Sequence, residues 1–239
     1  MVGLKKQLTA GISGLALLLS ISLCSPNQKF KKENLAQKGS PKGMTLSSLP
    51  LEENKTLNYL TEDTIKTYGS GDIFAKRKEF VENARKYFGA EYIWGGRLTK
   101  MNPGLDCLGL IFLPYAETFN KKWTEISVNP SEIIEKKQLG KQIKGLDGIL
   151  TENIDFSKLE EGDIIYLLAE ERKINDKPLA EINGKKYWPW HTGIYSNKEK
   201  NLFLHANPGA YPRGEMKVVE YDFKEILKDN DALFVTRIY

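Results

Sequence analysis

Residues 106–112 of this 239-residue chain read DCLGLIF, and this stretch decides how the fold is organised. From here apolar side chains recur at helical spacing, namely Leu108, Ile111, Phe112, Tyr115 and Phe119. The pattern predicts a buried helix with Asp106 as its N-cap and Cys107 as its first residue. Free backbone N–H groups and the positive end of the helix dipole stabilise a thiolate at this position, and the thiolate is the nucleophilic form of cysteine.

A second helix is predicted on the amino-terminal side of this stretch. Residues 73–88, IFAKRKEFVENARKYF, place apolar side chains on one stripe and charged side chains opposite, and Gly89 is a C-cap candidate. The motif YIWGG follows at residues 92–96, where two glycines allow the chain to turn tightly. We therefore expect a helix, a glycine loop and the cysteine helix in succession.

The chain contains two histidines, and both fall in predicted strands. His191 begins HTGIY, and His205 lies in LFLHA at residues 202–206, after a turn at residues 196–201. Hairpin pairing would bring both rings to one face of the sheet. One imidazole could then take the proton of Cys107 while a second polar group orients it. The residues alone leave two alternatives open: unrelated strand histidines, or a zinc site with Cys107.

Composition and charge narrow the functional classes. The chain is 41% hydrophobic and 28% charged, as is typical of a globular protein, and its length suits one sizeable domain with tails. Of the formal net charge of +4, eight lysines against three glutamates before residue 58 carry +5, which leaves −1 for the rest. The predicted domain is therefore close to neutral, and we expect no nucleic-acid partner.

The amino terminus is typical of an exported protein. A short basic stretch precedes the uncharged run at residues 10–23, which is too short to span a membrane, so residues 1–23 are predicted to be a signal peptide. ISLC at residues 21–24 resembles the lipobox of bacterial lipoproteins, although Leu23 stands where a small residue is usual. Cys24 is thus a candidate lipidation site. The alternatives are that the signal peptide is cleaved at another position, or that it stays uncleaved as an anchor. Residues 24–58 are expected to form a disordered tether.

Five motifs in order resemble the NlpC/p60 cysteine peptidases. They are FVENARKYFGAEYIWGG at residues 80–96, DCLGL at 106–110, LEEGDIIYL at 159–167, HTGIY at 191–195 and LFLHA at 202–206. The resemblance spans about residues 73–239. It implies a catalytic domain at residues 59–239 with a papain-like α+β fold, in which the helix that bears the cysteine packs against an antiparallel sheet.

The resemblance also implies roles for individual residues. Cys107 would be the nucleophile, His191 the general base and His205 the residue that orients His191. Tyr92 would line the active site and donate its hydroxyl to the developing oxyanion.

Three further residues are candidates for substrate binding. Asp106 lies where the family has an acidic residue beside the nucleophile, and it could contact a free amine of a stem peptide as well as cap the helix. Trp94 and Trp190 could contact substrate through their rings, although plain packing is the alternative for Trp190. No metal and no cofactor is expected.

The sequence departs from the family pattern in three places. Leu108 replaces the serine that usually follows the nucleophile, which puts the substrate preference in question. Residues 120–156 and 169–187 are longer than the family minimum, and we expect them to form a wall or lid over the cleft. Asn183 and Gly184 predict a hairpin within the second of these stretches.

The sequence predicts an exported, membrane-anchored monomer that acts as a cysteine endopeptidase on peptidoglycan stem peptides. In family terms the bond cleaved would join γ-D-Glu to the diamino acid. Another papain-like activity, of an amidase or an acyltransferase, would use the same cysteine and histidine. A catalytically idle cell-wall-binding lipoprotein is the alternative from a different class.

Overall fold

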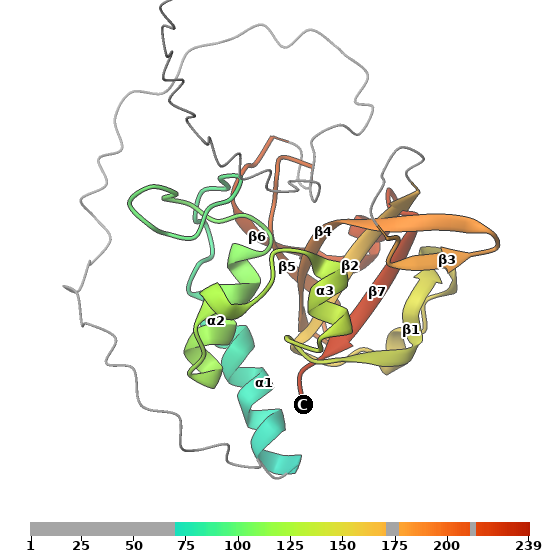
Figure 1. Cartoon of the computed structure of the whole chain (residues 1–239), viewed down its shortest axis with the longest axis horizontal. Helices are drawn as coiled ribbons and strands as arrows, with labels where there is room; N and C mark the ends of the chain where they lie inside the picture. The colour runs from blue at the N-terminus through green and yellow to red at the C-terminus, as the bar shows by residue number, and fades with distance from the viewer. Residues whose placement is uncertain (1–69, 171–176, 211–213) are drawn as a thin grey trace, which may run out of the picture.

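The computed structural model describes residues 70–170, 177–210 and 214–239 (Figure 1). The predicted signal peptide at residues 1–23, the lipidation candidate Cys24 and the tether at residues 24–58 lie outside the described residues. Within the described ranges, no helix combines the length and the hydropathy that a membrane crossing requires.

The described chain forms one antiparallel sheet with helices packed around it. The helices are α1 (Ser70–Arg85), α2 (Gly109–Phe119), α3 (Pro130–Glu135) and α4 (Phe223–Leu227), with single 3-10 turns at Trp123–Glu125, Thr151–Asn153 and Phe156–Lys158. The strands are β1 (Lys141–Leu150), β2 (Asp163–Glu170), β3 (Ala180–Ile182), β4 (Lys185–Asn197), β5 (Leu202–Ala206), β6 (Val218–Asp222) and β7 (Ala232–Arg237). Their order in the sheet is β1-β7-β2-β4-β5-β6, and β3 pairs with β4.

Strand β2 lies in the middle of the sheet and is covered on both sides. Ile164, Tyr166 and Leu168 belong to the core cluster that also holds buried residues of α1 and α2, whereas Ile165 and Leu167 belong to a second cluster with residues of α4. Alternate residues of a strand face opposite sides of a sheet, which explains the continuous apolar run of β2. The predicted α+β fold, with the helix that follows Cys107 packed against an antiparallel sheet, is confirmed (Figure 1).

Both predicted helices differ from the structure at their ends. Helix α1 begins at Ser70, three residues before its predicted start. Helix α1 ends at Arg85 rather than at residue 88, and residues 86–89 form a turn in which Gly89 has a φ of +81° and donates its N–H to the Val218 carbonyl at 2.8 Å. Phe88 is consequently 61% exposed and does not extend the buried stripe. Helix α2 begins at Gly109, two residues after Cys107. Hydrogen bonds at helix ends, which periodicity does not reveal, account for both differences.

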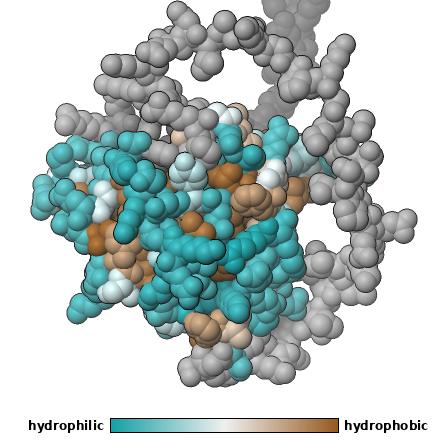
Figure 2. Space-filling model, turned by 180° about the vertical axis from the view of Figure 1, so that it is seen from behind, coloured by the Kyte–Doolittle hydropathy of each residue, from teal (hydrophilic) through white to brown (hydrophobic). Residues whose placement is uncertain are grey.

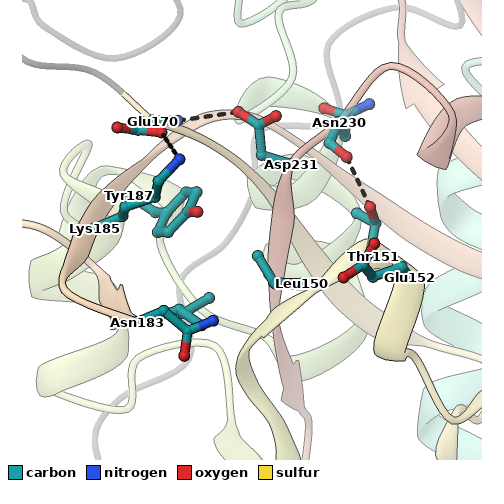
Figure 3. Close-up of a pocket in the computed structure, with 10 residues that line it drawn as sticks. Leu150, Thr151, Glu152, Glu170, Asn183, Lys185, Tyr187, Asn230 and Asp231 are labelled. Atoms are coloured by element: carbon teal, nitrogen blue, oxygen red, sulfur yellow. Dashed lines mark hydrogen bonds and ion pairs between the residues drawn. The ribbon is translucent and has the colours of Figure 1, made fainter.

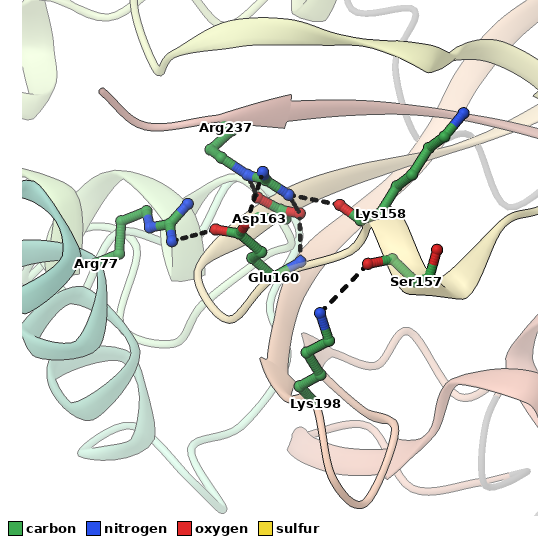
Figure 4. A network of polar contacts seen from close by, with 7 residues as sticks. All are labelled: Arg77, Ser157, Lys158, Glu160, Asp163, Lys198 and Arg237. Carbon is green, nitrogen blue, oxygen red and sulfur yellow. Dashed lines mark hydrogen bonds and ion pairs between the residues drawn. The ribbon is translucent and has the colours of Figure 1, made fainter. Parts of the chain in front are cut away.

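The turn before β2 is fixed by a network of charged side chains around the buried Asp163 (Figure 4). Gly162 has a φ of +86°, and Asp163 accepts the Glu160 N–H at 2.8 Å and two hydrogen bonds of 2.7 Å from Arg237. Arg77 of α1 pairs with Glu160. The network therefore connects α1, the start of β2 and the end of β7.

The two stretches that are longer than the family minimum, residues 120–156 and 169–187, add strands to the sheet. Residues 120–156 supply α3 and strand β1, which pairs with β7 at the edge of the sheet. In the second stretch, β3 and β4 form the hairpin predicted around Asn183 and Gly184, which have φ values of 52° and 74°. Hydrophilic residues cover most of the face seen from behind, with apolar residues in small separate areas (Figure 2).

Candidate active site

The start of helix α2 positions Cys107. Asp106 accepts the Gly109 N–H through its side chain at 2.6 Å and the Leu110 N–H through its carbonyl at 3.1 Å. The N-cap position, however, is occupied by Leu108, which has helical angles (φ −76°, ψ −36°), so the prediction of Asp106 as N-cap and Cys107 as first helical residue is wrong by two residues. The Asp106 carboxylate still bonds the first N–H of the helix. Cys107 itself is buried in the turn that leads into the helix.

The Asp106 carboxylate also holds the glycine loop against the helix. It accepts the Gly95 N–H at 3.0 Å and pairs with the buried Arg97 guanidinium, which lies over the Phe112 ring at 5.3 Å from its centroid. These contacts use both carboxylate oxygens, and every partner is part of the protein. Asp106 therefore fixes the geometry around Cys107, and its expected contact with substrate stays a prediction.

Close backbone contacts explain the glycines of this loop. A Cβ atom at Gly96 would lie 2.5 Å from the Gly104 carbonyl oxygen, and one at Gly109 would lie 2.5 Å from the Gly96 carbonyl oxygen. Gly95 has a φ of +72°, which favours glycine. The tight turn predicted for YIWGG is present, and it brings the loop directly against the first turn of α2.

The two histidines lie against each other, as the hairpin pattern predicts. His191 Nε2 and His205 Nδ1 are 2.8 Å apart, and both rings are buried. The pairing of β4 with β5, with Ile194 opposite Leu204, makes the two residues diagonal neighbours. His191 Nδ1 is buried and has no hydrogen-bond partner among the described residues.

Cys107 and His191 line the same pocket, although they are far apart in the sequence. The pocket has a free volume of about 10 Å³, which is about the space that one water molecule needs. Its lining comprises Cys107, Leu108, Pro130, Tyr166, Pro189, Trp190, His191 and Thr192. The structure therefore brings the predicted nucleophile and the predicted base together within closely packed surroundings.

A β-bulge brings Trp190 onto the ring of His191. Leu167 of β2 pairs with His191 and Leu168 pairs with Pro189, so Trp190 is an extra residue in β4. Neighbouring residues of a regular strand point to opposite faces, but a bulge redirects a side chain. The two rings stack with centroids 5.2 Å apart, and Trp190 Nε1 donates to Asn230 Oδ1 at 2.8 Å.

Two predicted site residues are not brought into this pocket. Tyr92 is buried, and its N–H donates to the Met216 carbonyl at 2.9 Å, but Tyr92 is not among the residues that line the pocket. Trp94 is 42% exposed and does not line it either. Both lie in the loop whose path is set by its backbone contacts, which the motif alone does not reveal.

The structure also adds residues that the sequence did not single out. Thr192 and Tyr166 face the pocket from β4 and β2, and burial raises the pKa of Tyr166 above its ordinary value, which keeps its phenol neutral. Pro130 comes from the first long stretch, which thus supplies part of the wall. Thr192 could have been predicted from the sequence, because it directly follows His191. Nothing in the sequence around Pro130 or Asn230 indicated that they would lie near the site.

Metal binding was the alternative for Cys107 and the histidines. Among residues 70–170, 177–210 and 214–239, no three side chains of His, Cys, Asp or Glu are grouped in a way that could hold a metal ion. The lining of the pocket includes the thiol of Cys107, the imidazole of His191, the phenol of Tyr166 and the hydroxyl of Thr192.

Comparison with solved structures finds proteins of the NlpC/P60 type. NlpC1 from Trichomonas vaginalis is 17% identical with a TM-score of 0.43, covering 72% of this chain and 46% of that one. The peptidoglycan hydrolase RipB from Mycobacterium tuberculosis is 17% identical with a TM-score of 0.45, covering 72% and 69%. A Staphylococcus aureus protein described as similar to a lipoprotein of the NLP/P60 family is 18% identical with a TM-score of 0.41, covering 76% and 46%.

This chain therefore spans less than half the length of the matched Trichomonas and Staphylococcus proteins. No protein-family model and no curated protein matches the sequence. At such identities and TM-scores, the activities of the matched proteins are not transferred to this chain.

Proposed function

We propose that this chain is a cysteine peptidase of the NlpC/p60 type that hydrolyses stem peptides of peptidoglycan, at the bond between γ-D-Glu and the diamino acid. The observation that carries this proposal is the His191 ring. Its Nε2 is bonded to His205, while its Nδ1 is buried and unpartnered among the described residues, in a wall of the pocket that holds Cys107.

The contact between the two histidines supports one direction of proton transfer. For His191 to accept a proton at Nδ1, its own proton must be on Nε2, so that Nε2–H donates to His205 Nδ1. The Cys107 thiol then transfers its proton to His191 Nδ1, and the resulting imidazolium is held in place by His205. This tautomer gives His191 the role of base and His205 the role of an orienting group.

The reaction then proceeds through an acyl-enzyme. The Cys107 thiolate attacks the peptide carbonyl, and the Cys107 backbone N–H stabilises the oxyanion, with the Tyr92 hydroxyl as the further predicted donor. His191 gives its proton to the leaving amine as the C–N bond breaks and a thioester forms. Water, deprotonated by His191, hydrolyses the thioester and restores the thiol.

The amino-terminal segment fits the same proposal. Export through residues 1–23 would bring the domain to the cell envelope, and lipid on Cys24 would anchor it to a membrane beside its polymer substrate. The tether at residues 24–58 would provide the reach from the membrane to the cell wall.

The test is digestion of purified muropeptides, in which the stem peptide is still attached to its sugar, by the full chain, with products read by mass spectrometry. The variant Cys107→Ala should release no product, whereas Cys24→Ala, which changes the only other cysteine, should keep the activity. Product masses identify the bond, and a stem peptide released intact from its sugar would instead indicate an amidase. Absence of cleavage by the unmodified chain, together with no selective alkylation of Cys107 by iodoacetamide, would contradict the proposal.

A further inference from the structure

Trp190 covers one face of the His191 ring. The two rings stack with centroids 5.2 Å apart and an angle of 29° between their planes. At its edge the imidazole is bonded to His205, through His191 Nε2, at 2.8 Å. Its other nitrogen, Nδ1, is buried and has no hydrogen-bond partner among the described residues. An indole that stays in place therefore opposes rotation of the imidazole, which would move Nδ1.

Asn230 is the residue that holds the indole. Trp190 Nε1 donates to Asn230 Oδ1 at 2.8 Å, and this N–H is the only polar group of the indole. Trp190 is an extra residue in β4, so regular pairing with β2 does not determine where its side chain points. Trp190 is also only partly buried, so packing does not enclose it fully. The hydrogen bond to Asn230 thus fixes an orientation that the strand does not.

Asn230 itself is bonded through every polar group that it has. Its Nδ2 donates to the Ile226 carbonyl at 2.6 Å, and its backbone N–H donates to the Leu227 carbonyl at 3.2 Å. Its carbonyl accepts the Thr151 hydroxyl at 2.8 Å, beside a separate pocket that both residues line (Figure 3). Because Nδ2 faces Ile226, Oδ1 faces the indole. The Asn230 side chain is therefore a rigid acceptor, oriented by bonds in which Trp190 takes no part.

Helix α4 also supports the other partner of the His191 ring. Phe223, the first residue of this helix, stacks on Phe203 with centroids 5.2 Å apart, and Phe203 stacks on His205 at the same distance. Phe223 and Phe203 are fully buried. Helix α4 and the turn after it therefore support both groups that restrain His191, although none of their residues lines the Cys107 pocket.

We propose that Asn230 is a positioning residue for the reaction at Cys107. Through the indole of Trp190, it keeps the His191 ring in the orientation in which Nδ1 accepts the proton of the thiol. This role rests on the proposed function, in which His191 is the base. A base held out of place transfers the proton more slowly, whereas substrate binding is unchanged because Asn230 does not line the Cys107 pocket. Loss of the Asn230 side chain should therefore lower kcat and leave KM as it is.

The test is a double-mutant cycle in the full chain, with Asn230→Ala, Trp190→Phe and the two combined. Each single variant removes the bond between Asn230 and the indole, and each should lower kcat on muropeptides about fivefold with KM unchanged. The double variant should also lose about fivefold, rather than the roughly 25-fold of independent effects. Alkylation of Cys107 by iodoacetamide, which needs no substrate, should slow by the same factors.

Unfolding curves are recorded for every variant. If Asn230→Ala is unfolded, Asn230→Ser, with a shorter polar side chain, takes its place in the cycle. The matched control is Asn83→Ala: Asn83 is a buried asparagine of α1 whose side chain donates to the Thr118 hydroxyl at 2.9 Å. Its substitution also costs a buried hydrogen bond but should leave kcat and the alkylation rate unchanged.

Three results would overturn the positioning role of Asn230. They are an unchanged kcat and alkylation rate in Asn230→Ala, losses that multiply to about 25-fold in the double variant, and an equally large fall in Asn83→Ala. Hydrolysis by the unmodified chain without coupling between Asn230 and Trp190 refutes only this role. Coupled alkylation rates without hydrolysis support the role and refute only the peptidase.

Discussion

Two buried aspartates in this molecule, Asp106 and Asp163, each pair with an arginine and accept a hydrogen bond from a backbone N–H. Asp106 pairs with Arg97 and accepts the N–H of Gly109 at the start of α2. Asp163 pairs with Arg237 and accepts the N–H of Glu160 at the start of β2. In both, an arginine balances the buried charge while the carboxylate fixes the backbone at the beginning of an element.

The residues that follow each aspartate determine whether this arrangement positions a candidate site residue or a part of the scaffold. Asp106 is followed by Cys107, so its bonds set the position of a residue that lines the same small pocket as His191. Asp163 is followed by the apolar strand β2, and its network joins elements of the scaffold (Figure 4). Burial raises the pKa of Asp163, and the hydrogen bonds from Arg237 and from the Glu160 amide oppose this rise only in part. The comparison teaches that a buried ion pair indicates a fixed backbone. Whether that backbone serves a functional site depends on which side chain comes next in the chain.

The largest expected effects are those of the two histidines near the first aspartate. His191→Ala should lower kcat/KM by about 10³-fold, because it removes the proposed base. His205→Ala should cost less, about 10²-fold, because it only misplaces the base. Steady-state kinetics on stem peptides give both values, and unfolding curves should show both variants folded. Equal losses would contradict the separate roles.

Substitution of the aspartates themselves compares the two regions directly. Asp163→Asn removes the buried carboxylate that accepts two hydrogen bonds from Arg237 and leaves Glu160 as the remaining counter-charge of that guanidinium. The free energy of unfolding should therefore fall by about 2 kcal/mol. Alkylation of Cys107 by iodoacetamide should proceed at an unchanged rate in this variant while it is folded. Asp106→Asn should destabilise the fold by a similar amount and also change the alkylation rate. The comparison fails if Asp163→Asn alters Cys107 reactivity as much as Asp106→Asn does.

A smaller effect is expected from the tryptophan beside the base. Trp190→Phe keeps an aromatic ring that can stack on His191 but loses the hydrogen bond to Asn230, which is worth about 1 kcal/mol. We expect kcat to fall a few-fold, with a shift in its pH profile because the surroundings of His191 change. Trp188→Phe, in the same strand, is the control and should leave that profile in place. A shift of the same size in the pH profiles of both variants would contradict a specific role for Trp190 at the site.

The smallest effect concerns acid stability around the second aspartate. Burial alone would raise the pKa of Glu160, but the hydrogen bond from Arg77 and the charge of Arg237 outweigh it and lower this pKa. The unfolded chain therefore binds the proton more readily, so stability should fall as the pH drops below about 4.5 through the lower folded pKa. Chemical unfolding of Glu160→Gln between pH 3 and pH 6 should show a shallower decline than the unmodified chain. An identical decline in the two proteins would exclude this contribution.

The sequence by itself determined which local elements form around the candidate site. Helical spacing identified the buried helix after Cys107, strand patterns placed His191 and His205 on neighbouring strands, and Asn183 with Gly184 predicted a hairpin that the structure contains. These features depend on contacts between residues that are close in the sequence, where the periods of helix and strand apply directly. The hydrogen bond from the Gly109 N–H to the Asp106 carboxylate is also local, spanning three residues.

Only the tertiary structure decided which distant residues meet. Pairings across many residues placed Pro130 in the Cys107 pocket, Asn230 against Trp190, and β7 between β1 and β2. The same packing left Tyr92 and Trp94 out of that pocket and exposed Phe88 at the end of its predicted stripe. The physical reason is that a bulge, a turn at positive φ or a buried ion pair redirects a side chain through backbone hydrogen bonds, and their partners lie too far along the chain for any local pattern to record.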